Sequence, residues 1–226
     1  MKFRKKELYL HSLMCILGGF FGAYAIVNGF GNMGSAQTTN MIEVVCTVLG
    51  KNYFDFFLRI LAFLLYVSAI GVCVYIDKRT KINTHKYAIS VEIIIMMGLA
   101  FMPHEINPLV ALLPIFFMMA TQWSVFHGVG KYNSATIFST NNLRQCVSGF
   151  VEYILDKNPE QLEKGKFYAN SLLWFHIGAA IAYFACKAFG YSAGLTAIPV
   201  AVAAYIIEIM PEHIDEDVTE TVDIKA

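Results

Sequence analysis

The chain has 226 residues, of which 57% are hydrophobic and only 15% are charged, whereas a soluble domain usually has about 25% charged residues. This composition excludes an ordinary water-soluble domain and indicates a single integral membrane domain over residues 1–226. The formal net charge is zero, and the absence of a basic stripe with interleaved aromatic residues excludes nucleic acid as a partner.

Six apolar segments approach the roughly 20 residues that a helix needs to cross about 30 Å of hydrocarbon. In chain order they are approximately 8–27, 54–76, 87–102, 108–126, 167–188 and 193–210. The lipid bilayer is therefore the first predicted partner. Residues 212–226 form an acidic tail that we expect to be disordered.

Basic residues near the ends of these segments predict the topology, because cytoplasmic loops are enriched in Lys and Arg. They concentrate at the N-terminus, in the second connection and in the fourth: Lys2, Arg4, Lys5, Lys6; Lys78, Arg79, Lys81, Lys86; Lys157, Lys164, Lys166. The alternate connections carry few. We therefore expect both termini in the cytoplasm.

Two Gly-rich polar segments nearly repeat each other. Asn28-Gly-Phe-Gly-Asn-Met-Gly-Ser-Ala36 returns as His127-Gly-Val-Gly-Lys-Tyr-Asn-Ser-Ala135, at a spacing of 128 − 29 = 99 residues. Each follows an apolar segment, and each half of the chain ends on Met-Pro. The halves, about 8–103 and 108–211, then hold three spans each, so the second copy enters the bilayer inverted. We predict an all-α, six-span bundle of two inverted three-helix repeats, with a short Gly-broken amphipathic helix after the first and fourth spans.

The N-terminus also resembles a cleaved signal peptide, because the apolar residues 13–21 precede Ala23-Tyr-Ala25. The repeat disfavours this alternative: the first span corresponds to the fourth, which cannot be a signal peptide.

The two amphipathic segments carry the predicted binding site. The first is a helix over 38–50, and the second is a longer helix beginning near Ser134. Unwound backbone at membrane depth is tolerated where protein buries it or water fills a cavity, and free N–H groups at a helix start favour an anion. Arg144 adds a fork of donors suited to carboxylate or phosphate. The predicted substrate-binding residues are Thr39, Asn40, Glu43, Asn141, Asn142 and Arg144. The alternative is a pair of capped interfacial helices without a cavity.

The segments Ala36-Gln-Thr-Thr-Asn40 and Ser139-Thr-Asn-Asn-Leu-Arg144 resemble the Thr-Gly-Asn and Thr-Gly-Asn-Leu-Arg elements of the YoaK-like family. Thr39 and Asn141 stand where that family usually has glycine. The resemblance covers nearly the whole chain. It implies a six-helix bundle in the bacterial inner membrane and no established substrate.

Ionisable residues inside a bilayer are functional candidates because they are costly to place there. We interpret Arg59, Glu92 and Glu208 as residues near span ends that snorkel to the surface. His176 lies deeper, and Glu43 and His176 are the pair that proton coupling would use. A patch of small residues suits helix packing or a homodimer contact: Gly178, Ala179, Ala180 and Ala182.

The sequence favours a transporter for a small polar, anionic solute bound between the two repeats. The alternative is a non-transporting membrane scaffold, which a dry Leu/Phe-packed centre would favour over a hydrated cavity. We expect no enzyme, since no catalytic motif is present. We also expect no cofactor and no metal site, because the five cysteines are scattered singly.

Overall fold

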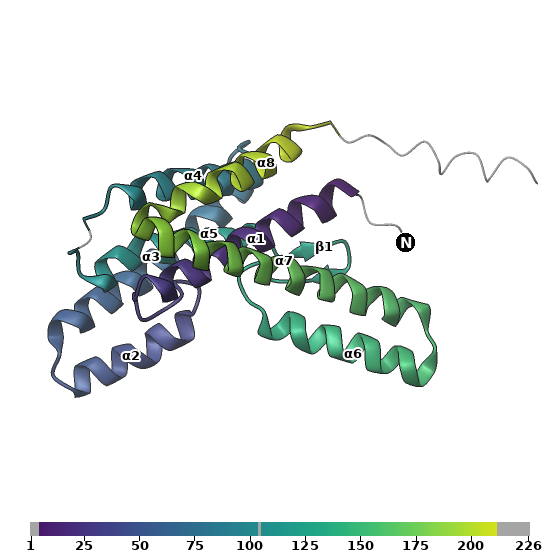
Figure 1. Ribbon diagram of the computed structural model, residues 1–226, viewed down its shortest axis with the longest axis horizontal. Coiled ribbons are helices and arrows are strands. Elements are labelled where there is room, and N and C mark those ends of the chain that lie inside the picture. Colours follow the sequence, from purple (N-terminus) through teal and green to yellow (C-terminus); the bar gives the residue numbers. More distant parts are fainter. Residues whose placement is uncertain (1–4, 104, 212–226) are drawn as a thin grey trace, which may run out of the picture.

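The computed structural model describes residues 5–103 and 105–211, so the predicted acidic tail, Lys2 and Arg4 lie outside it. Helices dominate the described chain (Figure 1): α1 (Lys5–Val27), α2 (Gln37–Leu49), α3 (Tyr53–Arg79), α4 (Thr84–Ala100), α5 (Pro108–Val125), α6 (Thr140–Asp156), α7 (Pro159–Phe189) and α8 (Ile198–Ile209). A hairpin of β1 (Gly128–Val129) and β2 (Tyr132–Asn133) precedes α6, and a 3-10 helix, η1 (Gly190–Ala197), joins α7 to α8. The all-α prediction is confirmed.

Four helical segments are long and apolar enough to cross a membrane: α1, α3, α5 and the continuous run Pro159–Ile209. The predicted third segment coincides with α4, which has 17 residues. The predicted fifth and sixth segments both fall within the run from α7 through η1 to α8, where η1 turns the chain back. The fold is therefore a helical membrane bundle.

Asparagine side chains determine where several helices begin. Each Oδ1 atom accepts a hydrogen bond from an N–H group in the first turn of the helix that follows it. The four caps are Asn52 before α3 (3.3 Å), Asn83 before α4 (2.9 Å), Asn107 before α5 (2.8 Å) and Asn158 before α7 (3.0 Å). These caps satisfy donors that a helix start leaves without intrahelical partners. Pro108 and Pro159 follow directly in α5 and α7, at positions where the missing N–H costs nothing.

The helices pack in crossed pairs. α1 packs mainly along α7, and α3 packs mainly along α5. At the α1–α7 contact the backbones touch: a Cβ on Gly178 would lie 2.0 Å from the Ile16 carbonyl oxygen, and one on Gly19 would lie 1.8 Å from that of Phe175. Small residues permit this close approach, as they do between membrane helices generally.

The small-residue patch on α7 is used partly within the chain. Gly178 lies against α1, and Ala182 is completely buried, whereas Ala180 is exposed. Dimerisation through this patch stays a prediction.

The centre of the bundle is apolar and aromatic. Tyr24 and Phe30 are in edge contact at 5.9 Å between ring centroids, and Phe30 meets Tyr191 at 5.3 Å. The Tyr24 hydroxyl donates to the Tyr191 carbonyl oxygen at 2.8 Å, which satisfies its one buried polar group. Phe20, Phe21 and Phe116 are also buried in this core. It is the Phe-rich packing that the scaffold alternative anticipates.

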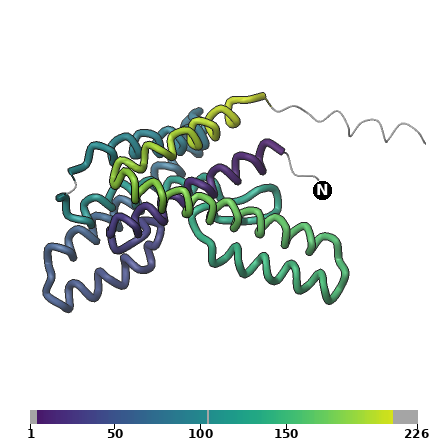
Figure 2. Tube along the Cα trace, in the orientation of Figure 1, coloured from purple at the N-terminus to yellow at the C-terminus, as the bar shows by residue number. Residues whose placement is uncertain are grey.

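Two helical pairs project from the bundle (Figure 2). One consists of α2 and the start of α3, and the other of α6 and the start of α7. Apolar faces of α2 and α6 point outward, with Ile42, Leu49, Val147 and Ile154 all exposed. Exposed apolar stripes are expected on helices that meet lipid.

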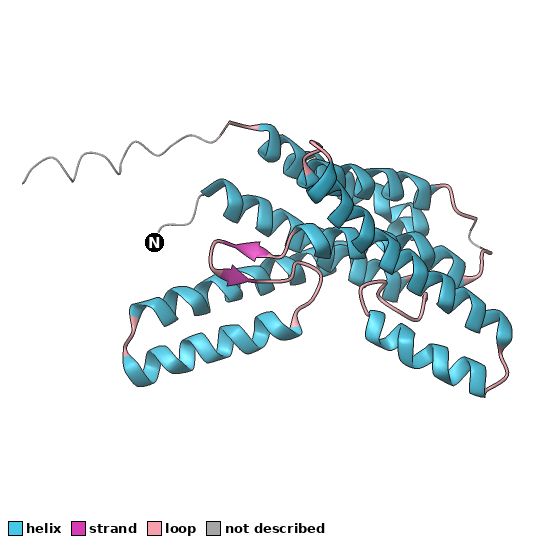
Figure 3. Ribbon diagram, turned by 180° about the vertical axis from the view of Figure 1, so that it is seen from behind, coloured by secondary structure: helices cyan, strands magenta, loops and turns pink. Residues whose placement is uncertain are grey.

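The two Gly-rich segments fold differently despite their similar sequences. In the first, Gly29, Gly31 and Gly34 have positive φ values of 76°, 75° and 67°, and the chain turns directly into α2, close to the predicted 38–50. In the second, residues 128–133 form the β-hairpin, visible in magenta in Figure 3.

The predicted start of the second helix near Ser134 is therefore wrong, because α6 begins at Thr140. The physical reason lies in the residues between the hairpin and the helix. The Ser134 N–H donates to the His127 carbonyl oxygen at 3.0 Å and closes the hairpin. The Thr136 hydroxyl accepts a 3.0 Å hydrogen bond from buried Gln122 of α5. These contacts hold residues 134–136 outside a helix.

Candidate functional site

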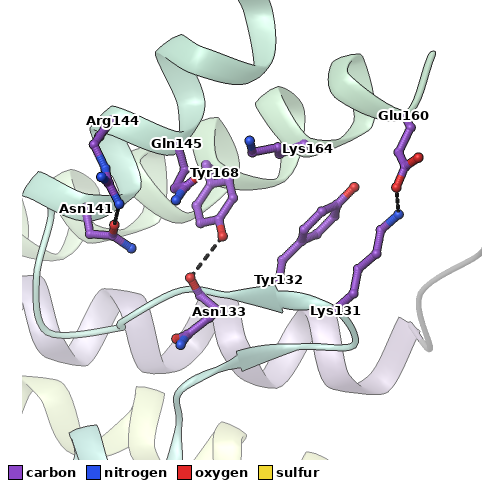
Figure 4. Close-up of a pocket in the computed structure, with 9 residues that line it drawn as sticks. All are labelled: Lys131, Tyr132, Asn133, Asn141, Arg144, Gln145, Glu160, Lys164 and Tyr168. Atoms are coloured by element: carbon purple, nitrogen blue, oxygen red, sulfur yellow. Dashed lines mark hydrogen bonds and ion pairs between the residues drawn. The ribbon is translucent and has the colours of Figure 1, made fainter. Parts of the chain in front are cut away.

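A surface pocket of about 450 Å³ lies where the hairpin meets α6 and α7. Figure 4 shows side chains from all three elements around it. The hairpin contributes Lys131, Tyr132 and Asn133; α6 contributes Asn141, Arg144 and Gln145; α7 contributes Glu160, Lys164 and Tyr168. The pocket is thus formed entirely by the second half of the chain.

Two close contacts fix the shape of this pocket. The α6 and α7 backbones approach at Gly149, where a Cβ would lie 2.7 Å from the Gly165 nitrogen. The Tyr168 hydroxyl donates to the Asn133 carbonyl oxygen at 2.9 Å and so ties the hairpin to α7 (Figure 4). The Tyr132 ring packs 5.9 Å from the ring of Tyr168. The hairpin is therefore held as one wall of the pocket.

The pocket is electropositive. Lys131, Arg144 and Lys164 line it, against the single carboxylate of Glu160, so the formal charge of the lining is 3 − 1 = +2. Lys131 forms an ion pair with Glu160, and this hydrogen bond raises the pKa of the Lys131 ammonium. Arg144 donates to Asn141 Oδ1 at 3.2 Å. Its remaining donors and the Lys164 ammonium are suited to an anion such as a carboxylate, sulfate or phosphate.

The structure brings two of the six predicted substrate residues, Asn141 and Arg144, into this pocket. Asn142 points the other way and is only 1% exposed. Its Nδ2 donates to the carbonyl oxygens of Ala135 at 2.8 Å and Phe138 at 3.2 Å, and its Oδ1 accepts from the Ser134 hydroxyl at 3.1 Å. It ties the irregular segment to the start of α6.

The other three predicted residues lie on α2. Asn40 is buried and donates to the Arg59 carbonyl oxygen at 3.1 Å. The Arg59 guanidinium forms an ion pair with Glu43, and Thr39 is exposed. This group holds α2 against α3, apart from the pocket that Arg144 lines. His176 is exposed and hydrogen-bonds to the Leu172 carbonyl oxygen at 2.7 Å. Glu43 and His176, the predicted proton-coupling pair, are therefore bonded to different partners.

Several pocket residues were not predicted. Glu160, Lys164 and Tyr168 are spaced at i, i+4 and i+8, so they lie on one face of α7. That spacing could have indicated a shared polar face, but the sequence analysis uses Lys164 only to predict the topology. Lys131 and Tyr132 depend on the hairpin, which the sequence pattern did not indicate.

A buried polar network lies beneath the pocket. His11 Nε2 is 3.1 Å from Ser134 Oγ and 3.2 Å from Ser171 Oγ, and all three side chains are buried. The network joins α1, the segment before α6, and α7. A serine beside a histidine is a nucleophile–base arrangement, but here the groups satisfy one another inside the bundle and none of them lines the pocket. Within residues 5–103 and 105–211, no cluster of three or more His, Cys, Asp or Glu side chains could hold a metal ion.

The fold and pocket define a helical membrane protein with an electropositive surface site. The family described as "Protein of unknown function (DUF1275)" matches residues 10–208. The chain therefore belongs to the DUF1275 family, which confirms the resemblance to the YoaK-like proteins. Comparison with curated proteins found no match. Comparison with solved structures also found none.

Proposed function

We propose that the protein is a multi-pass permease for a small anionic solute, which binds in the electropositive pocket. The observation that carries the proposal is the concentration of three cationic side chains in one pocket, together with the amides of Asn141 and Gln145. Cationic and amide donors converging on one cavity are suited to an anion of several oxygen atoms.

The pattern of helix contacts supports an architecture of two inverted repeats. The α1–α7 contact has a counterpart in α5–α3, the α2–α3 contact in α6–α7, and the α1–α8 contact in α5–α4. The α4–α8 contact is its own counterpart. Such a pattern is expected if α1–α4 and α5–α8 are copies related by a two-fold axis. The six spans would then be α1, α3, α4, α5, α7 and α8, as in transporters with repeat symmetry.

The positions of the chain ends support an even number of spans. The Lys6 ammonium donates to the backbone carbonyl oxygens of Glu208 at 3.0 Å and Met210 at 2.8 Å. The start of α1 and the end of α8 therefore lie side by side. Together with the basic loops, this favours both termini in the cytoplasm of a bacterial cell and the pocket on the cytoplasmic side of its inner membrane.

The second candidate is a non-transporting membrane scaffold whose pocket only binds an anion. The packed aromatic centre around Tyr24, Phe30 and Tyr191 favours it, because a carrier must open a path there. The two candidates agree on anion binding and differ on flux. An anion that binds but does not cross the membrane would select the scaffold.

Binding can be tested by thermal unfolding of the purified protein with sulfate, inorganic phosphate or nitrate. A ligand at 100 times its Kd stabilises the folded state by about 2.7 kcal/mol. We expect at least one anion to raise the Tm of the wild type and of Arg79→Gln, whose side chain is exposed and outside the pocket. Arg144→Gln should lose the response. An equal rise in Tm for Arg79→Gln and Arg144→Gln would show that the anion does not bind in this pocket.

A further inference from the structure

Glu92 is the one carboxyl group that the described bundle encloses completely. Its residue is 0% exposed, and neither Oε1 nor Oε2 has a hydrogen-bond partner among the described residues. It lies eight residues from each end of α4 (92 − 84 and 100 − 92), or about 12 Å along the axis. The interpretation of Glu92 as a snorkelling residue near a span end is therefore wrong.

No cationic side chain of the described residues is bonded to this carboxyl group. α4 packs against α5, η1, α8 and, near its start, α3. α5 has no ionisable side chain. The ionisable residues of the other three elements are Tyr191 on η1, Tyr205 and Glu208 on α8, and Tyr53, Asp55, Arg59, Tyr66, Cys73, Tyr75, Asp77, Lys78 and Arg79 on α3. α4 itself carries His85, Lys86 and Tyr87 before Glu92. A buried carboxylate without a partner is very unfavourable, so this fold accommodates the protonated, uncharged acid.

A second titratable group lies on the same face of α4. His85 precedes Glu92 by seven residues, so the two side chains project in nearly the same direction, about 10 Å apart along the axis. His85 Nδ1 is 3.2 Å from Glu208 Oε2 of α8, and Glu208 Oε1 accepts from Asn83 Nδ2 at 2.9 Å. The His85 side chain is 41% exposed. The His85–Glu208 pair thus lies where the α4–α8 contact meets water, at the start of α4 and the end of α8.

We propose that Glu92 is a proton-binding site at the contact between the two halves of the bundle, reached from water past His85 and Glu208. Proton binding converts the carboxylate to the neutral acid and allows α4 and α8 to close over it. Loss of the proton leaves a charge that only an opened, hydrated contact can solvate. An axial separation of about 10 Å between His85 and Glu92 is too long for one hydrogen bond, so proton exchange requires that opening.

The proton site itself does not depend on the proposed function. Only its role in supplying the coupling ion for transport rests on that function. An anion entering a cell works against the inside-negative membrane potential. Each proton carried with it cancels one unit of that charge. A carboxyl group that binds a proton at the α4–α8 contact would therefore let an anion permease carry a compensating positive charge.

Infrared spectroscopy tests the proton site without any transport. At neutral pH the wild type should show the carbonyl stretch of a protonated carboxylic acid, and Glu92→Gln should lack it. Glu152→Gln, on α6 and away from α4, is the matched control and should keep the band. Because glutamine resembles the neutral acid in shape and charge, the Glu92 variant should fold with an unchanged Tm. A band that persists in Glu92→Gln would overturn the assignment.

Proton movement tests the coupling separately. Sulfate, which does not titrate near neutral pH, is added outside proteoliposomes that contain a pH-sensitive dye. The wild type and Glu152→Gln should acidify the lumen, and Glu92→Gln should not, while its Tm still responds to sulfate. Sulfate-driven acidification in Glu92→Gln would overturn the coupling role. If the wild type moves neither sulfate nor protons, the proposed function fails for sulfate, and the infrared result still decides whether Glu92 holds a proton.

Discussion

Asn142 gives the sharpest prediction about the fold, because one buried amide makes three hydrogen bonds to the segment before α6. Replacing it by alanine removes the donor to the Ala135 and Phe138 carbonyl oxygens and the acceptor for the Ser134 hydroxyl. Ser134 retains Ser171 and His11 as alternatives, so the cost comes mainly from the two carbonyl groups. At about 1–2 kcal/mol for each, Asn142→Ala should destabilise the protein by about 2–4 kcal/mol.

Thermal unfolding in detergent measures this effect against a control one residue away. For a chain of this size, the loss corresponds to a fall in Tm of roughly 5–10 °C. Asn141→Ala removes an exposed side chain bonded only to Arg144, and its stability should change by less than about 0.5 kcal/mol. Equal Tm values for the two variants would refute the structural role of Asn142. It would then return to the set of ligand-binding candidates.

Two further predictions concern helix contacts and the pocket. Gly178→Ala should lower the free energy of unfolding by about 1–3 kcal/mol or more, because its Cβ would lie 2.0 Å from the Ile16 carbonyl oxygen. The control Gly71→Ala, whose Cβ would have no atom within 4 Å, should leave the stability unchanged. Similar Tm values for the two variants would argue against close α1–α7 packing. Glu160→Gln should raise the affinity for sulfate several-fold in isothermal titration, because it removes the Glu160 carboxylate from the pocket lining and frees Lys131 from its ion pair. Weaker binding in that variant would contradict an electropositive anion site.

The apolar segments followed from the sequence because apolar runs and caps are local signals, although α7 begins at Pro159, before the predicted residue 167. Asn107 followed by Pro108 marks the start of α5 in the sequence as it does in the structure. The first Gly-rich segment also folded as expected, since positive φ at Gly29, Gly31 and Gly34 turns the chain out of α1 and into α2. The second segment did not, because the residues between its hairpin and α6 are held by the side chains of Gln122 and Asn142, whose directions the sequence does not give.

The site was only partly predictable for a related reason. An asparagine at a helix start can face a ligand or a backbone carbonyl group, and its sequence context does not distinguish the two. Asn141 and Asn142 are adjacent, and the structure gives one to the pocket and the other to the backbone. Glu92 shows a similar limit: the predicted span 87–102 places it near a span end, whereas in the structure α4 begins at Thr84 and its neighbours bury Glu92 completely.

The uptake of labelled anion into proteoliposomes tests the central claim most directly. Wild-type protein should accumulate whichever of sulfate, phosphate or nitrate raises its Tm, above the level of protein-free vesicles. Arg79→Gln should match it, and Arg144→Gln should fall to background, because the pocket loses its guanidinium. Accumulation that is unaffected by Arg144→Gln, or binding without any accumulation in the wild type, would contradict a permease that loads its solute at this pocket.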